Sequence, residues 1–223
     1  MTTRETRLPE LWDLIWQNTF STLWIVALVM LIGGLLGLVL GVSLYVTRPG
    51  GLFTNRPVSV VLNVLVNFFR PIPFVILVAA VQPGARLVVG TGIGNRAVIF
   101  AMVVGSMFAI GRIVEQNLVT VQPGVIEAAR SMGASRFRIL RTVALPEALG
   151  PLVLGYTFAF VAVIDMQAIS GVIAGDGLGN FALNYGFKQF DTAVTWTAVV
   201  IIVVIVQVVQ FGGNRLARHF LRR

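Results

Sequence analysis

Five apolar runs of membrane-spanning length constrain this chain more than any other feature of the sequence. A helix needs about 20 apolar residues to cross the hydrocarbon core of a bilayer. Charged residues make up 12% of the 223 positions, whereas a soluble domain has about 25%. We therefore expect an all-α integral membrane protein in which residues 1–223 form a single transmembrane domain. The expected spans are residues 19–46, 58–81, 97–118, 149–170 and 192–211.

The first span carries a regular series of glycines. Gly33, Gly37 and Gly41 recur every four residues, so they fall on one face of a helix. Small residues mark helix interfaces in membranes because they let the backbone of a neighbouring helix approach closely. We therefore expect this face to be a helix-packing surface.

The second span is interrupted by Arg70-Pro71-Ile72-Pro73. Proline breaks a helix because it lacks an N–H donor and clashes with the preceding turn. An arginine at membrane depth costs a few kcal/mol on insertion scales, so it should face water or protein. Arg70, Pro71 and Pro73 are therefore candidates for the wall of a substrate pathway. The alternative is that Arg70 extends its side chain to the cytoplasmic edge of the membrane.

The third and fourth spans contain further polar side chains. Arg112 and Glu115 are three residues apart, a spacing that allows an ion pair on one helix face. Asp165 and Gln167 lie deep in the apolar fourth span, and an ionisable residue at that depth is a candidate functional group in a substrate pathway. The alternative for Asp165 is a structural role, as the partner of Arg70 or of a backbone donor.

The longest region without a membrane-spanning apolar run lies between the third and fourth spans. Pro123 suits the first turn of a helix, and Glu127 is expected near the positive end of that helix. Gly133 favours the end of the helix, Ser135 can cap a second one, and Pro146 is expected to end the unit. The first helix should present a face of little bulk, formed by Ala128, Ala129 and Met132. Such a short, smooth helix pair predicts a contact with another protein.

This region, residues 122–146, resembles the EAA loop of the membrane subunits of ABC importers. That pattern reads Glu-Ala-Ala, three residues, Gly, nine residues, Ile, one residue, Leu-Pro, and here Val143 stands at the Ile position. The resemblance implies that the loop is a coupling helix that docks on a separate ATPase subunit. The candidate coupling residues are those that match the pattern, together with Met132: Glu127, Ala128, Ala129, Met132, Gly133, Leu145 and Pro146.

The resemblance extends to other parts of the chain. Residues 44–50, 69–74, 89–91 and 177–179 are similar to the permeases of methionine importers, as is the five-span size. This resemblance implies a type I ABC importer permease fold, a homodimer, two copies of an ABC ATPase and an extracytoplasmic substrate-binding lipoprotein. It also implies a location in the bacterial inner (plasma) membrane, and import of methionine or a related amino acid by alternating access at the homodimer interface. In those permeases the segment that corresponds to the surroundings of Asp165 is weakly polar and contains no acid. Transport of a different small amino acid-like solute is therefore an open alternative.

The distribution of basic residues predicts the orientation of the chain, because cytoplasmic segments collect Lys and Arg. With a cytoplasmic C-terminus and the N-terminus outside, ten basic residues lie in the inner segments and five in the outer ones. The inner residues are Arg48, Arg56, Arg130, Arg136, Arg138, Arg141, Arg215, Arg218, Arg222 and Arg223. The outer residues are Arg4, Arg7, Arg86, Arg96 and Lys188.

No nucleotide-binding or catalytic motif accompanies these features. The P-loop pattern GxxxxGK[ST] does not occur, so we expect neither a catalytic residue nor a cofactor in this chain, with ATP and Mg²⁺ bound by the partner ATPase. The chain has no cysteine, its one histidine is His219, and no metal site is expected. The basic residues lie at expected membrane edges rather than in a block, which argues against nucleic-acid binding.

Two other classes of function are compatible with the sequence. An ion-coupled secondary transporter would use Asp165 and Arg70 as a relay and would work without an ATPase. A membrane scaffold or assembly subunit would use the glycine face, but it leaves the Glu-Ala-Ala register unexplained.

Overall fold

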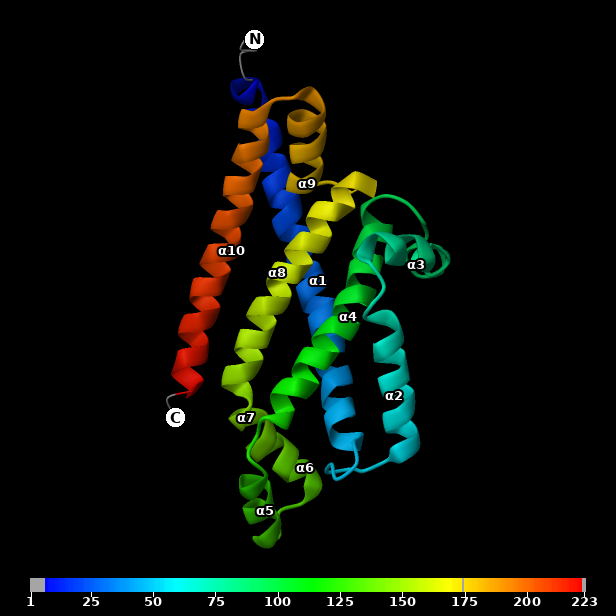
Figure 1. The fold of residues 1–223 in the computed structure, drawn as a ribbon, viewed down its shortest axis with the longest axis vertical. Helices are drawn as coiled ribbons and strands as arrows, with labels where there is room; N and C mark the ends of the chain where they lie inside the picture. The colour runs from blue at the N-terminus through cyan, green and yellow to red at the C-terminus, as the bar shows by residue number, and fades with distance from the viewer. Residues whose placement is uncertain (1–6, 174, 222–223) are drawn as a thin grey trace. The chain divides into compact units, whose positions relative to one another are not determined.

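The computed structural model describes residues 7–173 and 175–221, and every regular element in these ranges is a helix (Figure 1). Lipid offers no hydrogen-bond partner to backbone N–H and C=O groups, so a spanning segment satisfies them internally by forming a helix. The helices, in chain order, are η1 (Leu8–Leu11), α1 (Trp12–Thr47), α2 (Arg56–Phe69), α3 (Phe74–Val89), α4 (Asn95–Val119), α5 (Pro123–Ser131), α6 (Arg136–Ile139), η2 (Leu140–Ala144), α7 (Leu145–Glu147), α8 (Leu149–Ile173), α9 (Leu178–Phe181), η3 (Ala182–Gly186), η4 (Phe187–Gln189) and α10 (Thr192–Leu221).

Four helices of the described chain are long and apolar enough to cross a membrane, and a broken pair makes a fifth candidate. The broken pair is α2 and α3, and the chain bends sharply at the Arg70–Pro73 break. The all-α fold and the interruption of the second span therefore agree with the expectation from the sequence. The four continuous segments are Leu8–Thr47, Asn95–Val119, Leu149–Gly171 and Thr192–Leu221.

The chain divides into two compact units. Unit 1 consists of Met1–Ile32, Pro73–Val104 and Phe160–Val209, and unit 2 consists of Gly33–Ile72, Gly105–Ala159 and Gln210–Arg223. The chain thus passes from one unit to the other five times, after Ile32, Ile72, Val104, Ala159 and Val209. The segments expected outside belong to unit 1, and those expected inside belong to unit 2. The five passages equal in number the five spans expected from the sequence.

The core of unit 1 consists of apolar side chains from three of the long helices. Val29 of α1, Met102 of α4 and Val163 of α8 are almost fully buried in one cluster. A second cluster joins the start of α1 to α9 and α10, and it includes Ile15 and Phe181. Because lipid is as apolar as these side chains, close packing rather than exclusion of water holds such helices together.

In unit 2 the glycine face of α1 packs against α4. A β-carbon at Gly37 would lie 2.7 Å from the Cβ of Ile110, and one at Gly41 would lie 2.5 Å from the Cβ of Val114. Real Cβ atoms do not approach so closely, so glycine is the residue that fits at both positions. Gly33, the third glycine of the series, is buried. The structure thus places Gly37 and Gly41 at the kind of helix contact that their spacing predicts.

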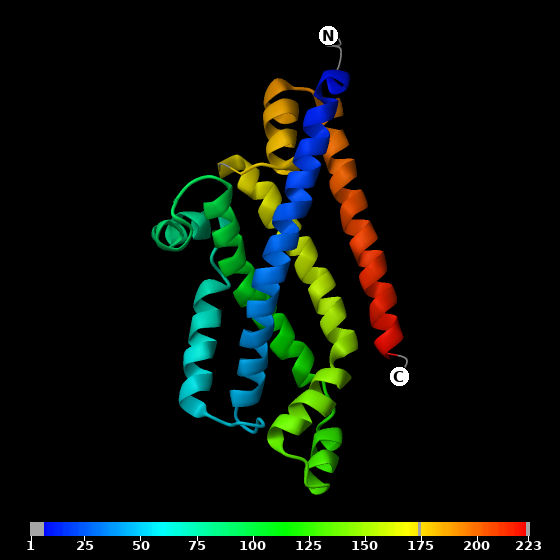
Figure 2. The same cartoon turned by 180° about the vertical axis from the view of Figure 1, so that it is seen from behind.

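A short turn connects α1 to α2, which lies beside the C-terminal part of α1 in both views (Figures 1 and 2). The backbone N–H of Phe53 donates to the carbonyl of Val46 at 2.9 Å, which closes the turn. Asn55 caps α2, since its side-chain oxygen accepts a hydrogen bond from the N–H of Val58 at 3.2 Å. These local contacts set where α2 begins.

Several helix boundaries differ from the expected spans. α1 begins at Trp12 and α10 continues to Leu221, because a helix does not have to end where the hydrocarbon ends. α3 continues to Val89 through Pro83, since membrane helices tolerate proline where neighbouring groups satisfy the freed backbone carbonyl. Residues 171–191, expected as a glycine-rich loop, contain α9, η3 and η4.

Candidate functional site

The region between the third and fourth spans folds as two short helices, α5 and α6, joined by a tight turn. Pro123 occupies the first turn of α5, where its missing N–H is not needed. Ser135 caps α6, because its Oγ accepts a hydrogen bond from the backbone N–H of Arg138 at 3.4 Å. α5 packs against α6 and η2. Local signals in the sequence therefore account for this helix pair.

Gly133 makes the turn between the two helices. Its φ angle is +77°, in the left-handed region that favours glycine. The N–H of Gly133 donates to the carbonyl of Arg130 at 2.9 Å, and the N–H of Ala134 donates to the carbonyl of Ala129 at 3.1 Å. A β-carbon at Gly133 would have no atom within 4 Å. Glycine is therefore needed here for its backbone conformation and not for space.

The outward surface of the loop combines small, flexible and aromatic side chains. Glu127 and Ala128 are exposed, Met132 is 80% exposed and Phe137 is 65% exposed. Ala129 is 4% exposed, so it belongs to the inner side of α5 and not to the outward face expected for it. The reason is geometric, because consecutive residues on a helix are separated by about 100°. Sequence reasoning missed Phe137, although an apolar ring between two arginines was an available signal.

Two further expectations for this region need correction. Glu127 lies in the second turn of α5. The helix dipole acts mainly on charges in the first turn, so the positive end of α5 does not stabilise the Glu127 carboxylate. Pro146 does not end the unit, because α7 (Leu145–Glu147) continues the helical chain from η2 toward α8. Proline is accommodated there since it occupies the first turn of α7.

The turn between α1 and α2 lies beside the α5–α6 region. Together they line a hollow of about 630 Å³, in which Arg130 and Arg136 are the charged residues. A smaller hollow of about 130 Å³ lies between Arg48, which stacks on Tyr45, and Glu127 of α5. The sequence predicts only that these segments share a side of the membrane, and it does not predict that they line a common hollow. The larger hollow is lined by Gly50, Gly51, Leu52, Thr54, Arg130, Ala134, Arg136 and Ile139.

The residues expected in a substrate pathway separate into two groups. Arg70, Pro71 and Pro73 are exposed at the break, and Asp165 is exposed on α8. Within the described residues, neither the guanidinium of Arg70 nor the carboxylate of Asp165 makes a hydrogen bond or an ion pair. Both charges are therefore free to meet water, solute or another chain.

Gln167 belongs to the second group, because it is buried and holds unit 1 together. Its Nε2 donates to the carbonyl of Asp176 at 2.8 Å, and its Oε1 accepts from the hydroxyl of Thr22 at 3.4 Å. The same hydroxyl accepts from the N–H of Leu178 at 2.9 Å. Gln167 thus ties α8 to α1 and to the start of α9. Its expected place in a pathway wall is not supported, since a residue two positions from Asp165 lies on the opposite side of the helix.

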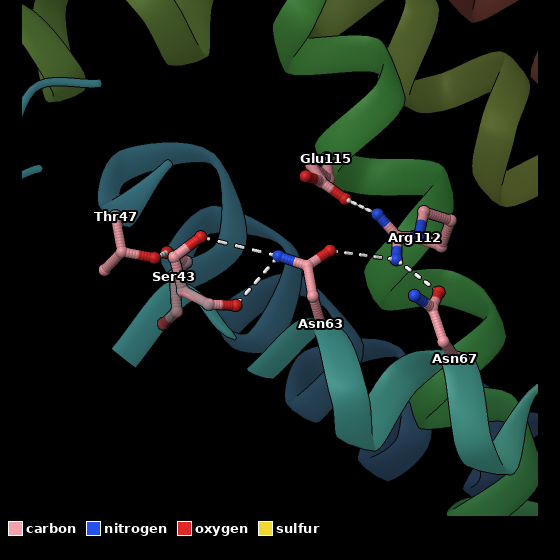
Figure 3. A network of polar contacts seen from close by, with 7 residues as sticks. Ser43, Thr47, Asn63, Asn67, Arg112 and Glu115 are labelled. Atoms are coloured by element: carbon pink, nitrogen blue, oxygen red, sulfur yellow. Dashed lines mark hydrogen bonds and ion pairs between the residues drawn. The ribbon is translucent and has the colours of Figure 1, made fainter. Parts of the chain in front are cut away.

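A polar network joins α2 and α4 inside unit 2 (Figure 3). Arg112 Nη1 donates to Glu115 Oε2 at 2.5 Å, which confirms the ion pair predicted from their spacing. Arg112 Nη2 also donates to the side-chain oxygens of Asn67 at 2.8 Å and Asn63 at 3.1 Å. The two asparagines of α2 were not predicted as partners, because sequence spacing reveals neighbours on one helix and not between helices.

The helical spans, the broken second span and the exposed α5–α6 region define the membrane permease class of ABC importers. The sequence matches the model of the family described as "Binding-protein-dependent transport system inner membrane component" over residues 33–223. The chain belongs to this family.

Similar proteins come from several bacteria. The chain is 38% identical to the probable D-methionine transport system permease protein MetI of Vibrio cholerae, over 93% of this chain and 92% of the relative. It is 38% identical to the methionine import system permease protein MetP of Bacillus subtilis, over 94% of both chains. It also resembles a solved structure of the MetNI methionine ABC transporter in an inward-facing conformation, with 37% identity, a TM-score of 0.90, and coverage of 95% of this chain and 98% of that chain.

Proposed function

We propose that this chain is the permease subunit of an ATP-driven importer for methionine or a closely related amino acid. Support comes from the names of the similar bacterial permeases and from the structural similarity to a methionine ABC transporter. The observation that carries the proposal is the α5–α6 region, where Gly133 turns the chain and leaves Ala128 and Met132 exposed. A small and exposed helix pair between spans is suited to dock on a separate ATPase subunit.

The proposed assembly contains two copies of this chain, two ATPase subunits and an extracytoplasmic substrate-binding lipoprotein. The description of the family as binding-protein-dependent supports the external partner. The absence of a P-loop pattern from the sequence supports separate ATPase subunits that bind ATP and Mg²⁺. The exposed coupling surface, rimmed by Arg130, Arg136, Arg138 and Arg141, would then contact the ATPase.

In the proposed orientation the N-terminus is outside and the C-terminus is cytoplasmic. The ten inner and five outer basic residues support this orientation. The grouping of α5, α6 and the α1–α2 turn in unit 2 is consistent with a common side for these segments. The coupling loop would then face the compartment that contains ATP.

In the proposed transport path, solute passes between the two copies of the chain by alternating access. Asp165 and Arg70 are the candidate path residues, because a charge in an apolar span is tolerated where it faces water or protein. Their exposed and unpaired side chains among the described residues support this role. Because the side chain at position 165 is an acid, solutes other than methionine should also be tested.

The test is uptake by proteoliposomes that contain the chain, its genomic neighbour ATPase and the matching binding protein. We expect labelled methionine to accumulate only with ATP inside and with the binding protein outside. Competition by other unlabelled amino acids then defines the solute. Uptake by the chain alone, driven by an ion gradient, would instead establish a secondary transporter and contradict the proposal.

A further inference from the structure

α2 carries a polar stripe along its whole length. The stripe residues are separated by three, four, four and three positions, a spacing that keeps them on one face of an α-helix. Other faces of α2 expose large apolar side chains such as Val61 and Val64. A polar face on a membrane helix has to meet protein or water. The stripe consists of Arg56, Ser59, Asn63 and Asn67 of α2 and of Arg70, the helical C-cap residue that follows Phe69.

Arg112 and Glu115 of α4 meet the middle of this stripe (Figure 3). Arg112 binds both asparagine side chains, and Asn63 Nδ2 in turn donates to the carbonyl of Ser59 at 2.8 Å. The side chains of Arg112 and Glu115 are 16% and 13% exposed. Two charges that are largely covered by protein depend on each other and on the amides, because a charge left without a partner in such a place is unfavourable.

The contact between α2 and α4 continues beyond the charges. The rings of Phe69 and Phe108 stack face to face, with centroids 4.5 Å apart. Phe108 lies one helical turn before Arg112 on α4, so the stacked rings and the ion pair occupy the same side of that helix. The two helices are therefore joined by both packing and charge within unit 2.

The polar contact lies between the two segments that transport needs to coordinate. α4 ends at Val119, seven residues or roughly 10 Å after Arg112, and α5 of the coupling loop begins at Pro123. At its other end α2 leads directly into the Arg70–Pro73 break. A rigid connection between α4 and α2 would carry a displacement of the coupling loop to that break.

We propose that Arg112, Glu115, Asn63 and Asn67 form a latch that makes α2 move together with α4 during the transport cycle. Arg112 is the positioning residue of the latch, because it binds the other three. The inference rests on the proposed function, since it concerns how a movement of the ATPase subunits is transmitted to the broken second span. A charged network with several simultaneous hydrogen bonds resists sliding, whereas an apolar contact can shift by small steps.

The test compares latch variants in the complete reconstituted complex. Arg112→Gln combined with Glu115→Gln removes both charges and leaves no buried ion unpaired. We expect this double variant to assemble with the ATPase and to hydrolyse ATP, but to move roughly tenfold less solute for each ATP, as for coupling free energies of ordinary size. Arg112→Lys retains the charge next to Glu115 and should restore part of the ratio. Arg218→Gln, which removes an exposed arginine of α10, is the matched control and should transport normally.

A second measurement follows the movement itself. The chain has no cysteine, so spin labels at Val61→Cys on α2 and Val119→Cys on α4 report the distance between the two helices. Both positions are exposed, at 58% and 46%. An excess of unlabelled copies gives complexes with a single labelled chain, so the measured distance is the one within that chain. We expect nucleotide trapping to leave this distance unchanged with the native latch and to change it in the double glutamine variant.

The latch is overturned if the double variant keeps the native ratio of solute to ATP, or if the label distance behaves alike in both backgrounds. A purely structural role would lower the yield and thermal stability of the complex without changing transport per ATP. A native complex that hydrolyses ATP but imports no methionine would contradict the proposed solute alone. The label distances would still decide whether α2 follows α4.

Discussion

Asn95 and Asp176 hold each other through two hydrogen bonds in unit 1. Asn95 Nδ2 donates to Asp176 Oδ2 at 2.5 Å, and the backbone N–H of Asp176 donates to Asn95 Oδ1 at 2.8 Å. The pair joins the first residue of α4 to the segment between α8 and α9. Gln167 of α8 donates to the carbonyl of the same Asp176. Asp176 therefore attaches its segment to both α4 and α8.

Asn95→Ala should loosen this segment without disturbing the spans. Loss of the two hydrogen bonds should cost about 1 kcal/mol, since Asn95 is half-buried and Asp176 is exposed. Hydrogen exchange at the amides of Gly177 and Leu178 should increase, and the thermal midpoint should fall slightly. Asp176→Asn keeps an acceptor for Asn95 and serves as the control. Equal exchange in the native protein and in Asn95→Ala would show that the pair does not hold the segment.

Gly133→Ala should weaken docking of the ATPase and lower ATP-driven uptake. A residue with a β-carbon costs about 1–2 kcal/mol in the left-handed conformation that Gly133 adopts. Gly133→Trp adds bulk at the docking surface and should abolish uptake while membrane insertion is retained. Gly124→Ala is the matched control, because a β-carbon there also meets no atom within 4 Å and the backbone φ is not positive. The measurements are ATPase copurification and uptake, and native values for both Gly133 variants would contradict the coupling role.

Gly41→Ala should destabilise the packing of α1 on α4. The added methyl would collide with the carbonyl oxygen of Gly111 and with Val114, and overpacking of this kind typically costs about 1–3 kcal/mol. Gly212→Ala is the control, since a β-carbon there meets no atom within 4 Å. Thermal unfolding in detergent should separate the two variants, and equal midpoints would argue against close packing at Gly41.

Asp165→Asn and Gln167→Ala should have opposite signatures, although the two residues are two positions apart. Asp165 is exposed, so its substitution should leave stability unchanged and alter the KM or solute preference of uptake. Gln167→Ala leaves buried polar partners unsatisfied, which should cost about 1–3 kcal/mol in stability. The comparison of thermal midpoint with uptake kinetics checks both expectations. Loss of stability in Asp165→Asn with unchanged kinetics would assign Asp165 a structural role.

Local sequence determined the helices and most of the α5–α6 region. Long apolar runs must form helices in lipid, Pro71 and Pro73 interrupt one of them, and Gly133 with Ser135 marks the turn between α5 and α6. The i,i+3 spacing of Arg112 and Glu115 was sufficient to predict their ion pair. These features depend on neighbours along the chain, so the order of residues alone contains the information.

Tertiary structure decided which helix faces are buried and which distant groups meet. Asp165 and Gln167 are both polar residues in the same apolar span. In the structure Asp165 is exposed, whereas Gln167 is buried and joins α8 to α1. The attachment of Asn63 and Asn67 to Arg112 likewise depends on how α2 lies against α4. The physical reason is that helix periodicity fixes relative angles around one axis, whereas the rotation of each helix toward its neighbours is set by packing between residues far apart in the chain.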